Sequence, residues 1–164
     1  MDSSSPRPWD PRDHDAQRRL LSQCLELAAQ AAEAGDVPVG AVVVDPEGTV
    51  IGEGFNTREA QNDPAGHAEI VALREAARRT GSWRLLDCTL AVTLEPCPMC
   101  AGAIVQTRVR TVVFGAWDEK AGAAGSVFDV LREPRLNHWV EVHPGVLADR
   151  CAVQLGDYFA ARRS

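Results

Sequence analysis

Two short segments carry the residues whose chemistry stands out in this chain of 164 residues. The first contains His67 and Glu69, and the second contains Cys97 and Cys100. Two thiolates three positions apart can bind one Zn²⁺ from a single helical turn, and an imidazole from another element supplies a third ligand. Three protein ligands leave a fourth position open, which is typical of a catalytic zinc. We therefore predict a catalytic site with one Zn²⁺ per subunit, bound by His67, Cys97 and Cys100.

Glu69 is the expected catalytic residue of this site, because a zinc-activated water needs a nearby proton carrier. Residues two positions apart on a regular helix diverge by about 200°. His67 and Glu69 can therefore share one site only if the helix begins just after Gly66, with His67 at its irregular entry, and we expect that start. A histidine and a glutamate upstream of Pro-Cys-x-x-Cys form the pattern of zinc deaminases, in which the glutamate moves protons between water and the base.

Each segment alone has a more ordinary interpretation. Most His-x-Glu triplets lie on helix surfaces, and Cys-x-x-Cys is also found in thiol redox proteins and in structural zinc sites. A redox protein needs no upstream His-x-Glu, and a structural zinc module or an RNA-binding protein with an inactive site needs no Glu69. The two segments in this order, with Pro96 before the first cysteine, favour the catalytic zinc site over both alternatives.

Hydrophobic periodicity predicts the elements that position these segments. A hairpin followed by alternating strands and helices predicts an α/β fold with a mixed sheet and helices on both faces. Both metal-binding segments fall at predicted helix starts, where the helix dipole favours a thiolate. Strands are expected at 39–44, 49–55, 89–94, 111–115 and 139–142, loops at 56–66 and 116–125, and helices at 13–34, 67–79, 97–107, 127–131 and 148–163.

The net charge argues against a broad electrostatic contact with nucleic acid. Seventeen basic and twenty-three acidic residues give a net charge of −6, whereas nucleic-acid-binding proteins usually carry a basic surplus. A local basic patch is still compatible with this total. Its candidate members are Arg108, Arg110, Lys120, Arg162 and Arg163.

The amino-terminal residues and the remaining cysteines indicate a cytoplasmic protein. Residues 1–12 are rich in Ser, Pro, Arg and Asp and lack an apolar core, so we expect a disordered arm rather than a secretory signal. No apolar run is long enough to span a membrane. In a reducing compartment Cys24, Cys88 and Cys151 are expected to be buried thiols. Residues 13–164 then form one zinc-dependent deaminase domain.

Nearly the whole chain, from about residue 14 to residue 163, resembles the bacterial tRNA-specific adenosine deaminases, which belong to the cytidine and deoxycytidylate deaminase superfamily. The likeness extends well beyond the two metal-binding segments. The matching stretches are residues 37–41, 52–56, 63–64, 67–70, 92–97, 113–116, 122–126, 129–131 and 137–138.

The resemblance implies a fold, a reaction and partners. The fold would be the cytidine-deaminase-like three-layer α/β/α sandwich with a five-stranded mixed sheet. The reaction would be the hydrolytic deamination of adenosine to inosine at the wobble position of tRNA. The partners would be the tRNA anticodon loop and a second copy of the chain in a homodimer.

Matching positions also imply substrate contacts. Asn56 would hydrogen-bond the target nucleoside, Val39 and Leu94 would wall the base pocket, and the backbone of Ala68 would contact the base. Asp118 would touch a flanking ribose, where a 2′-hydroxyl distinguishes RNA from DNA. Without the resemblance, Val39 and Leu94 would be interpreted as core residues, Asn56 as a turn residue and Asp118 as part of a solvated loop.

The same resemblance assigns Glu95 to ordering the metal loop, and the chain departs from the family at two positions of interest. Trp117 stands where a polar or basic residue is common, and Thr57 stands where arginine is frequent. The main alternative function is a deaminase of free guanine, free cytosine or a nucleotide, because the zinc chemistry would be the same.

Overall fold

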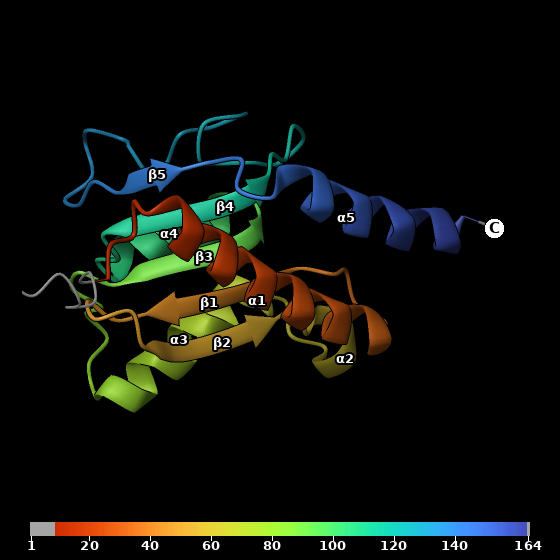
Figure 1. The fold of residues 1–164 in the computed structure, drawn as a ribbon, viewed down its shortest axis with the longest axis horizontal. Helices are drawn as coiled ribbons and strands as arrows, with labels where there is room; N and C mark the ends of the chain where they lie inside the picture. The colour runs from red at the N-terminus through yellow and green to blue at the C-terminus, as the bar shows by residue number, and fades with distance from the viewer. Residues whose placement is uncertain (1–8, 164) are drawn as a thin grey trace, which may run out of the picture.

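A five-stranded mixed sheet forms the centre of the computed structural model, which describes residues 9–163 (Figure 1). The strand order is β2-β1-β3-β4-β5. β1 pairs antiparallel with β2 and β3, whereas β3, β4 and β5 run parallel to one another. The strands are β1 (Gly40–Val44), β2 (Val50–Phe55), β3 (Thr89–Leu94), β4 (Thr111–Ala116) and β5 (Glu141–His143).

Helices cover both faces of this sheet. In the described part of the chain they are α1 (His14–Glu33), α2 (Arg58–Gln61), α3 (Ala68–Thr80), α4 (Pro98–Gln106) and α5 (Ala148–Arg162). α1 and the start of α5 pack on one face, and α3 and α4 pack on the other (Figure 1). The α/β sandwich expected from the sequence is therefore confirmed.

Alternate residues of the central strands supply two separate cores. In β1, Val42 and Val44 pack with α1, whereas Ala41 and Val43 pack with α3 and α4. Because successive side chains of a strand point to opposite faces, a strand buried on both faces is apolar throughout. This explains why residues 40–44 are all buried.

A glycine allows the start of α3 to approach the sheet. A side chain at Gly54 of β2 would place its Cβ 2.4 Å from the carbonyl oxygen of Ala68, the first residue of α3. Such a distance is far below van der Waals contact, so only glycine permits this packing. The close approach sets the position of the helix start next to His67.

One expected loop contains a short helix. Residues 56–66 were expected to be a loop without helix, but α2 forms one turn within them. The side chain of Asp36, which is buried, accepts hydrogen bonds from the backbone N–H groups of Glu59 and Ala60 at 3.0 and 3.1 Å. This contact joins residues more than twenty positions apart and satisfies N–H groups at the helix start.

One expected helix does not form. Residues 127–131 make a compact loop that bonds back onto the preceding segment. The N–H of Phe128 donates to the carbonyl of Gly122 at 3.0 Å, and the N–H of Val130 donates to the carbonyl of Ala123 at 2.9 Å. These bonds, to residues six and seven positions earlier, replace the i to i−4 bonds that a helix requires.

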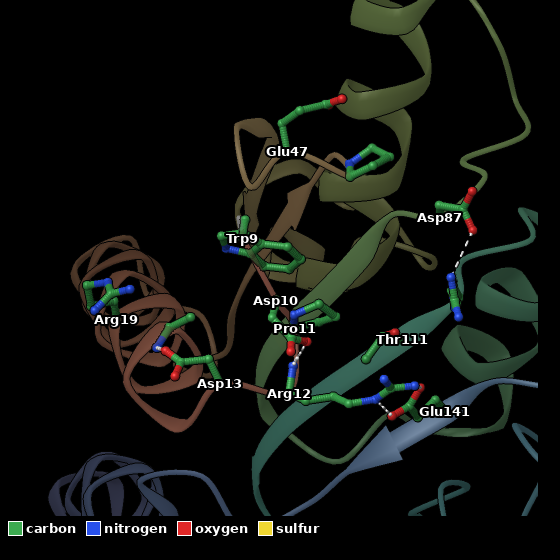
Figure 2. A pocket seen from close by; sticks show the side chains of 13 residues that line it. Trp9, Asp10, Pro11, Arg12, Asp13, Arg19, Glu47, Asp87, Thr111 and Glu141 are labelled. Carbon is green, nitrogen blue, oxygen red and sulfur yellow. Dashed lines mark hydrogen bonds and ion pairs between the residues drawn. The ribbon is translucent and has the colours of Figure 1, made fainter. Parts of the chain in front are cut away.

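Residues 9–12 lie across the edge of the sheet at which β3 and β4 begin (Figure 2). The Trp9 ring covers Gly48 in the turn between β1 and β2, where a Cβ would lie 2.2 Å from the indole. At the other end, the Arg12 guanidinium donates to both carboxylate oxygens of Glu141 in β5, at 2.8 and 3.2 Å. This segment therefore connects the hairpin turn to the last strand.

The ordered contacts of residues 9–12 differ from the expected disordered arm at residues 1–12. The indole and guanidinium contacts join residues far apart in the sequence, and composition alone gives no sign of them. Residues 1–8 lie outside the described residues. No helix within residues 9–163 has the length and apolar character needed to cross a membrane.

Candidate metal centre and active site

The two predicted metal-binding segments meet at one point. The ligand atoms of His67, Cys97 and Cys100 all lie within 4.8 Å of one another. His67 Nδ1 lies 3.5 Å from the Sγ of Cys97 and 3.3 Å from the Sγ of Cys100. One imidazole nitrogen and two sulfurs that converge in this way fit the donor set of a zinc site with three protein ligands.

Two helix starts bring these ligands together. His67 is the residue before α3 and has an extended backbone, with φ −80° and ψ 150°. Cys97 precedes α4 in the same way, with φ −76° and ψ 173°, and Pro98 fills the first position of that helix. The expected helix start just after Gly66 is confirmed, and both helices direct their positive amino ends toward the cluster.

The pKa values of the two cysteine thiols in the cluster shift in opposite directions. A hydrogen bond from the Cys100 thiol, helped by the His67 imidazole, lowers the pKa of Cys97 to about 4. The same hydrogen bond, together with burial, raises the pKa of Cys100. Cys97 is therefore a thiolate at neutral pH, and a thiolate is the form in which cysteine binds metals.

Glu69 is buried beside the cluster, with 4% of its surface exposed. Burial raises the pKa of its carboxyl group to about 7, although its hydrogen bond with Cys100 and the nearby His67 imidazole oppose that effect. The carboxyl group lies outside the three-ligand cluster. It is therefore available for a role other than that of a metal ligand.

Asn56 links the end of β2 to the start of α3. Its side-chain Oδ1 accepts the backbone N–H of Ala68 at 2.9 Å, and its own backbone N–H donates to the carbonyl of Val39 at 3.2 Å. The side chain is thereby oriented with its amide nitrogen away from Ala68. The backbone N–H of Ala68 is therefore paired with Asn56 in this structure.

The two expected pocket walls lie at strand ends near the cluster. Val39 immediately precedes β1 and is 5% exposed within the core that contains α3 and α4. Leu94 ends β3, is half-buried, and packs against both cores. Both residues therefore pack in or against the core. Leu94 also keeps an accessible surface at the end of β3, three residues before Cys97.

Glu95 organises the loop that contains Asp118. Its buried carboxylate accepts three backbone N–H groups, from Asp118 at 2.9 Å, from Ala124 at 2.9 Å and from Ser126 at 3.1 Å. A further bond, from the N–H of Ala123 to the carbonyl of Pro96 at 2.7 Å, ties this loop directly to the metal-binding segment. Glu95 thus orders residues 118–126, which are bonded in turn to the metal-binding segment, and the resemblance implied such an ordering role for it.

Asp118 itself forms a turn. Its Oδ1 accepts the backbone N–H groups of Lys120 and Ala121 at 3.1 and 3.2 Å, and its carbonyl accepts the Ser126 hydroxyl at 2.8 Å. Arg58, which follows the Thr57 that stands where the family often has arginine, is a neighbour of the cluster, and its Nη1 lies 3.4 Å from His67 Nε2. Its place follows from the unexpected helix α2.

A large cavity lies elsewhere in the described residues. It has a volume of about 970 Å³ and is lined by residues such as Trp9, Asp87, Arg110 and Glu141 (Figure 2). Those residues lie at the amino ends of β3 and β4, whereas the metal-binding cluster follows the carboxyl end of β3. In open α/β sheets, ligands bind at the carboxyl ends of the strands, so the chemistry belongs to the cluster.

Comparison with known proteins gives the family. Residues 14–116 match the cytidine and deoxycytidylate deaminase zinc-binding region. The chain is 49% identical over 145 residues to the tRNA-specific adenosine deaminase of Haemophilus influenzae, covering 88% of this chain and 84% of that protein. It is 45% identical over 143 residues to the tRNA-specific adenosine deaminase of Bacillus subtilis, covering 87% of this chain and 88% of that protein.

The chain belongs to the tRNA-specific adenosine deaminase family. A solved structure from work on A-to-I editing by tRNA:A34 deaminases at the wobble position superposes on this family member with a TM-score of 0.80. The two are 38% identical, and the match covers 83% of this chain and 98% of the other. The resemblance seen in the sequence is confirmed.

Proposed function

We propose that this chain converts adenosine to inosine at the wobble position of tRNA by hydrolysis of the exocyclic amine. The arrangement that carries the proposal is the His67, Cys97 and Cys100 cluster with the buried carboxyl of Glu69 beside it. It occurs in a chain that shares 49% identity with a tRNA-specific adenosine deaminase.

His67, Cys97 and Cys100 would hold one Zn²⁺ per subunit. When bound, the metal supplies Lewis-acid activation that brings the pKa of water to about 7. The low pKa of the Cys97 thiol prepares this donor for the metal. The amino ends of α3 and α4 add their N–H dipoles to the stabilisation of the thiolates.

Glu69 would move the protons. As the water oxygen bonds to C6, its carboxylate would accept one proton of that water and pass it to N1 of the purine. It would then carry the second proton, from the hydroxyl now on C6, to the amine, which leaves as ammonia. A carboxyl group whose pKa burial raises to about 7 can accept and donate protons near neutral pH. Burial also excludes bulk water from the carboxyl group that performs these transfers.

The surrounding residues would hold the nucleoside. The Asn56 amide, fixed through its Oδ1, would donate from its Nδ2 to the nucleoside, and Val39 and Leu94 would line the base with apolar surface. Ala68 would contact the base through its backbone. Asp118 would contact a ribose that flanks the target.

The partners would be the anticodon loop of tRNA in the cytoplasm and a second copy of the chain in a homodimer.

The candidate basic patch requires revision, because Arg110 pairs with Asp87 at 3.4 Å and lines the cavity at the other end of the strands from the cluster. Arg162 lies with its guanidinium carbon 4.2 Å from the centre of the Tyr158 ring on α5. Arg110 lies at the opposite end of the strands from the cluster, so we remove it from the proposed patch.

The test is incubation of the zinc-loaded protein with an anticodon stem-loop that carries adenosine at the wobble position. We expect inosine in the digested RNA, measured by mass spectrometry of nucleosides. Release of ammonia from free guanine, cytosine or a nucleotide, with no inosine in the RNA, would establish the alternative instead. Sedimentation of the same protein reports whether it is a homodimer.

A further inference from the structure

Trp117 is an exposed aromatic side chain at the same edge of the sheet as the metal-binding cluster. It directly follows β4 and is 45% exposed. Leu94 at the end of β3 pairs in parallel with Ala116 at the end of β4. Cys97 lies three positions after Leu94, so Trp117 and the metal-binding segment leave the sheet side by side.

Two contacts fix the position of the Trp117 indole and of the backbone next to it. Its ring packs edge-on against the buried Phe114, with 5.0 Å between ring centroids and an interplanar angle of 86°. The next residue, Asp118, donates its backbone N–H to the buried Glu95 carboxylate at 2.9 Å. An exposed aromatic ring on a rigid support loses little conformational entropy when it binds a partner.

Gly125, in the loop that follows Trp117, lies close to the indole. Gly125 has a φ of +129°, a backbone conformation that favours glycine. A Cβ at Gly125 would lie 3.4 Å from the Trp117 ring and 3.1 Å from the Arg132 guanidinium. The side-chain-free backbone of Gly125 thus lies between an indole and a guanidinium, the two groups on which unstacked RNA bases pack.

We propose that Trp117 is a stacking platform for an unpaired base of the RNA that flanks the target nucleotide. This inference rests on the proposed function. Single-stranded RNA is bound largely by the stacking of its bases on aromatic rings, which contributes about 1–3 kcal/mol per base. In a chain with a net charge of −6, stacking supplies binding energy that a basic surface would otherwise provide.

The experiment measures the affinity of the zinc-loaded, full-length protein for the anticodon stem-loop by fluorescence anisotropy. We expect Trp117→Ala to weaken binding by about tenfold to a hundredfold, and Trp117→Phe to retain most of the affinity. The matched control is Trp83→Ala. Trp83 is 55% exposed but lies ahead of β3, at the opposite edge of the sheet, so its loss should leave the affinity unchanged.

An abasic nucleotide placed on either side of the target identifies the stacked base. With the abasic nucleotide at one of the two positions, the wild type should bind the RNA as weakly as Trp117→Ala binds intact RNA. Trp117→Ala should bind that abasic RNA with no further loss of affinity. Equal affinities of the wild type and Trp117→Ala for intact RNA would overturn the proposal. A loss that persists with both abasic RNAs, or a change of oligomeric state in Trp117→Ala by sedimentation, would also overturn it, the latter because the indole would then contact a second copy.

The assay separates this inference from the proposed function. Inosine formation by the wild type tests the function without reference to Trp117. If the wild type forms inosine and Trp117→Ala binds the RNA with unchanged affinity, the stacking proposal is wrong and the proposed function stands. Absence of both inosine and stem-loop binding in the wild type removes both.

Discussion

The side-chain Oδ1 of Asn56 accepts the backbone N–H of Ala68 at 2.9 Å. This single bond ties the end of β2 to the first residue of α3. The residues on either side of Ala68 are the metal-binding His67 and the buried Glu69. The position of Asn56 therefore affects the geometry of the metal-binding cluster as well as any contact with the nucleoside.

Substitutions at Asn56 separate these two roles. Asn56→Ala should lower the free energy of unfolding by about 1–2 kcal/mol, because a buried N–H at a helix start loses its acceptor. Asn56→Asp keeps an acceptor near the positive end of α3 and should retain more of that stability, but it loses the amide donor and should lose editing activity. Denaturant unfolding and inosine formation measure the two effects. Full activity in Asn56→Asp would exclude the donor role.

Glu69→Gln should abolish turnover while the zinc content stays at the wild-type level. The amide keeps the shape of the side chain but cannot carry a proton, and the loss of a general acid–base group typically costs about 10²–10⁴-fold in rate. Metal analysis and inosine formation are measured on the same preparation. Glu53→Gln, at an exposed position of β2, is the matched control. Loss of zinc in Glu69→Gln would instead identify a metal ligand.

Glu95→Gln should impair binding of RNA more than it impairs the binding of zinc. A glutamine offers one acceptor oxygen in place of the carboxylate that receives three N–H groups, so at least one buried donor loses its partner at a cost of about 1–3 kcal/mol. We expect a raised KM with a smaller change in kcat. Glu119→Gln alters an exposed carboxylate of the same loop and should change neither constant. An unchanged KM in Glu95→Gln would show that residues 118–126 do not contact the substrate.

The ion pair between Arg12 and Glu141 predicts a pH dependence of stability. The hydrogen bond from Arg12 is the main cause that lowers the pKa of Glu141 from 4.5 to about 2. A carboxyl group with a lowered pKa stabilises the folded state above its unfolded value, and that stabilisation is lost as pH falls through the folded value. The difference in unfolding free energy between wild type and Glu141→Gln should therefore be constant above pH 4.5 and shrink between pH 4.5 and about 2.

The control for this measurement is Glu47→Gln. Glu47 lines the same cavity but forms no ion pair among the described residues (Figure 2). Its substitution should leave the shape of the pH profile unchanged. A difference between wild type and Glu141→Gln that stays constant down to pH 2 would show that the ion pair is not formed in solution.

The metal-binding cluster could be predicted from the sequence because its rules are local. The spacing of Cys97 and Cys100, and the need for His67 to stand at an irregular helix entry, follow from helix geometry alone. The strands could be predicted for a similar reason, since β-branched runs between turn residues are short-range signals.

The contacts that the sequence did not reveal depend on residues distant in the chain. Asp36 forms bonds with α2, and Glu95 holds a loop more than twenty positions away. Residues 127–131 contain apolar side chains at spacing compatible with a helix, yet their N–H groups bond to the preceding loop. Tertiary hydrogen bonds override local propensity at these places, and no pattern within a window of a few residues encodes them.

The position of Trp9 over the hairpin turn has a practical consequence. Trp9 lies at the edge where β3 and β4 begin, whereas His67 and the cysteines lie past the end at which β3 finishes. A fluorophore placed at position 9 itself would therefore lie at the end of the strands remote from the metal-binding cluster.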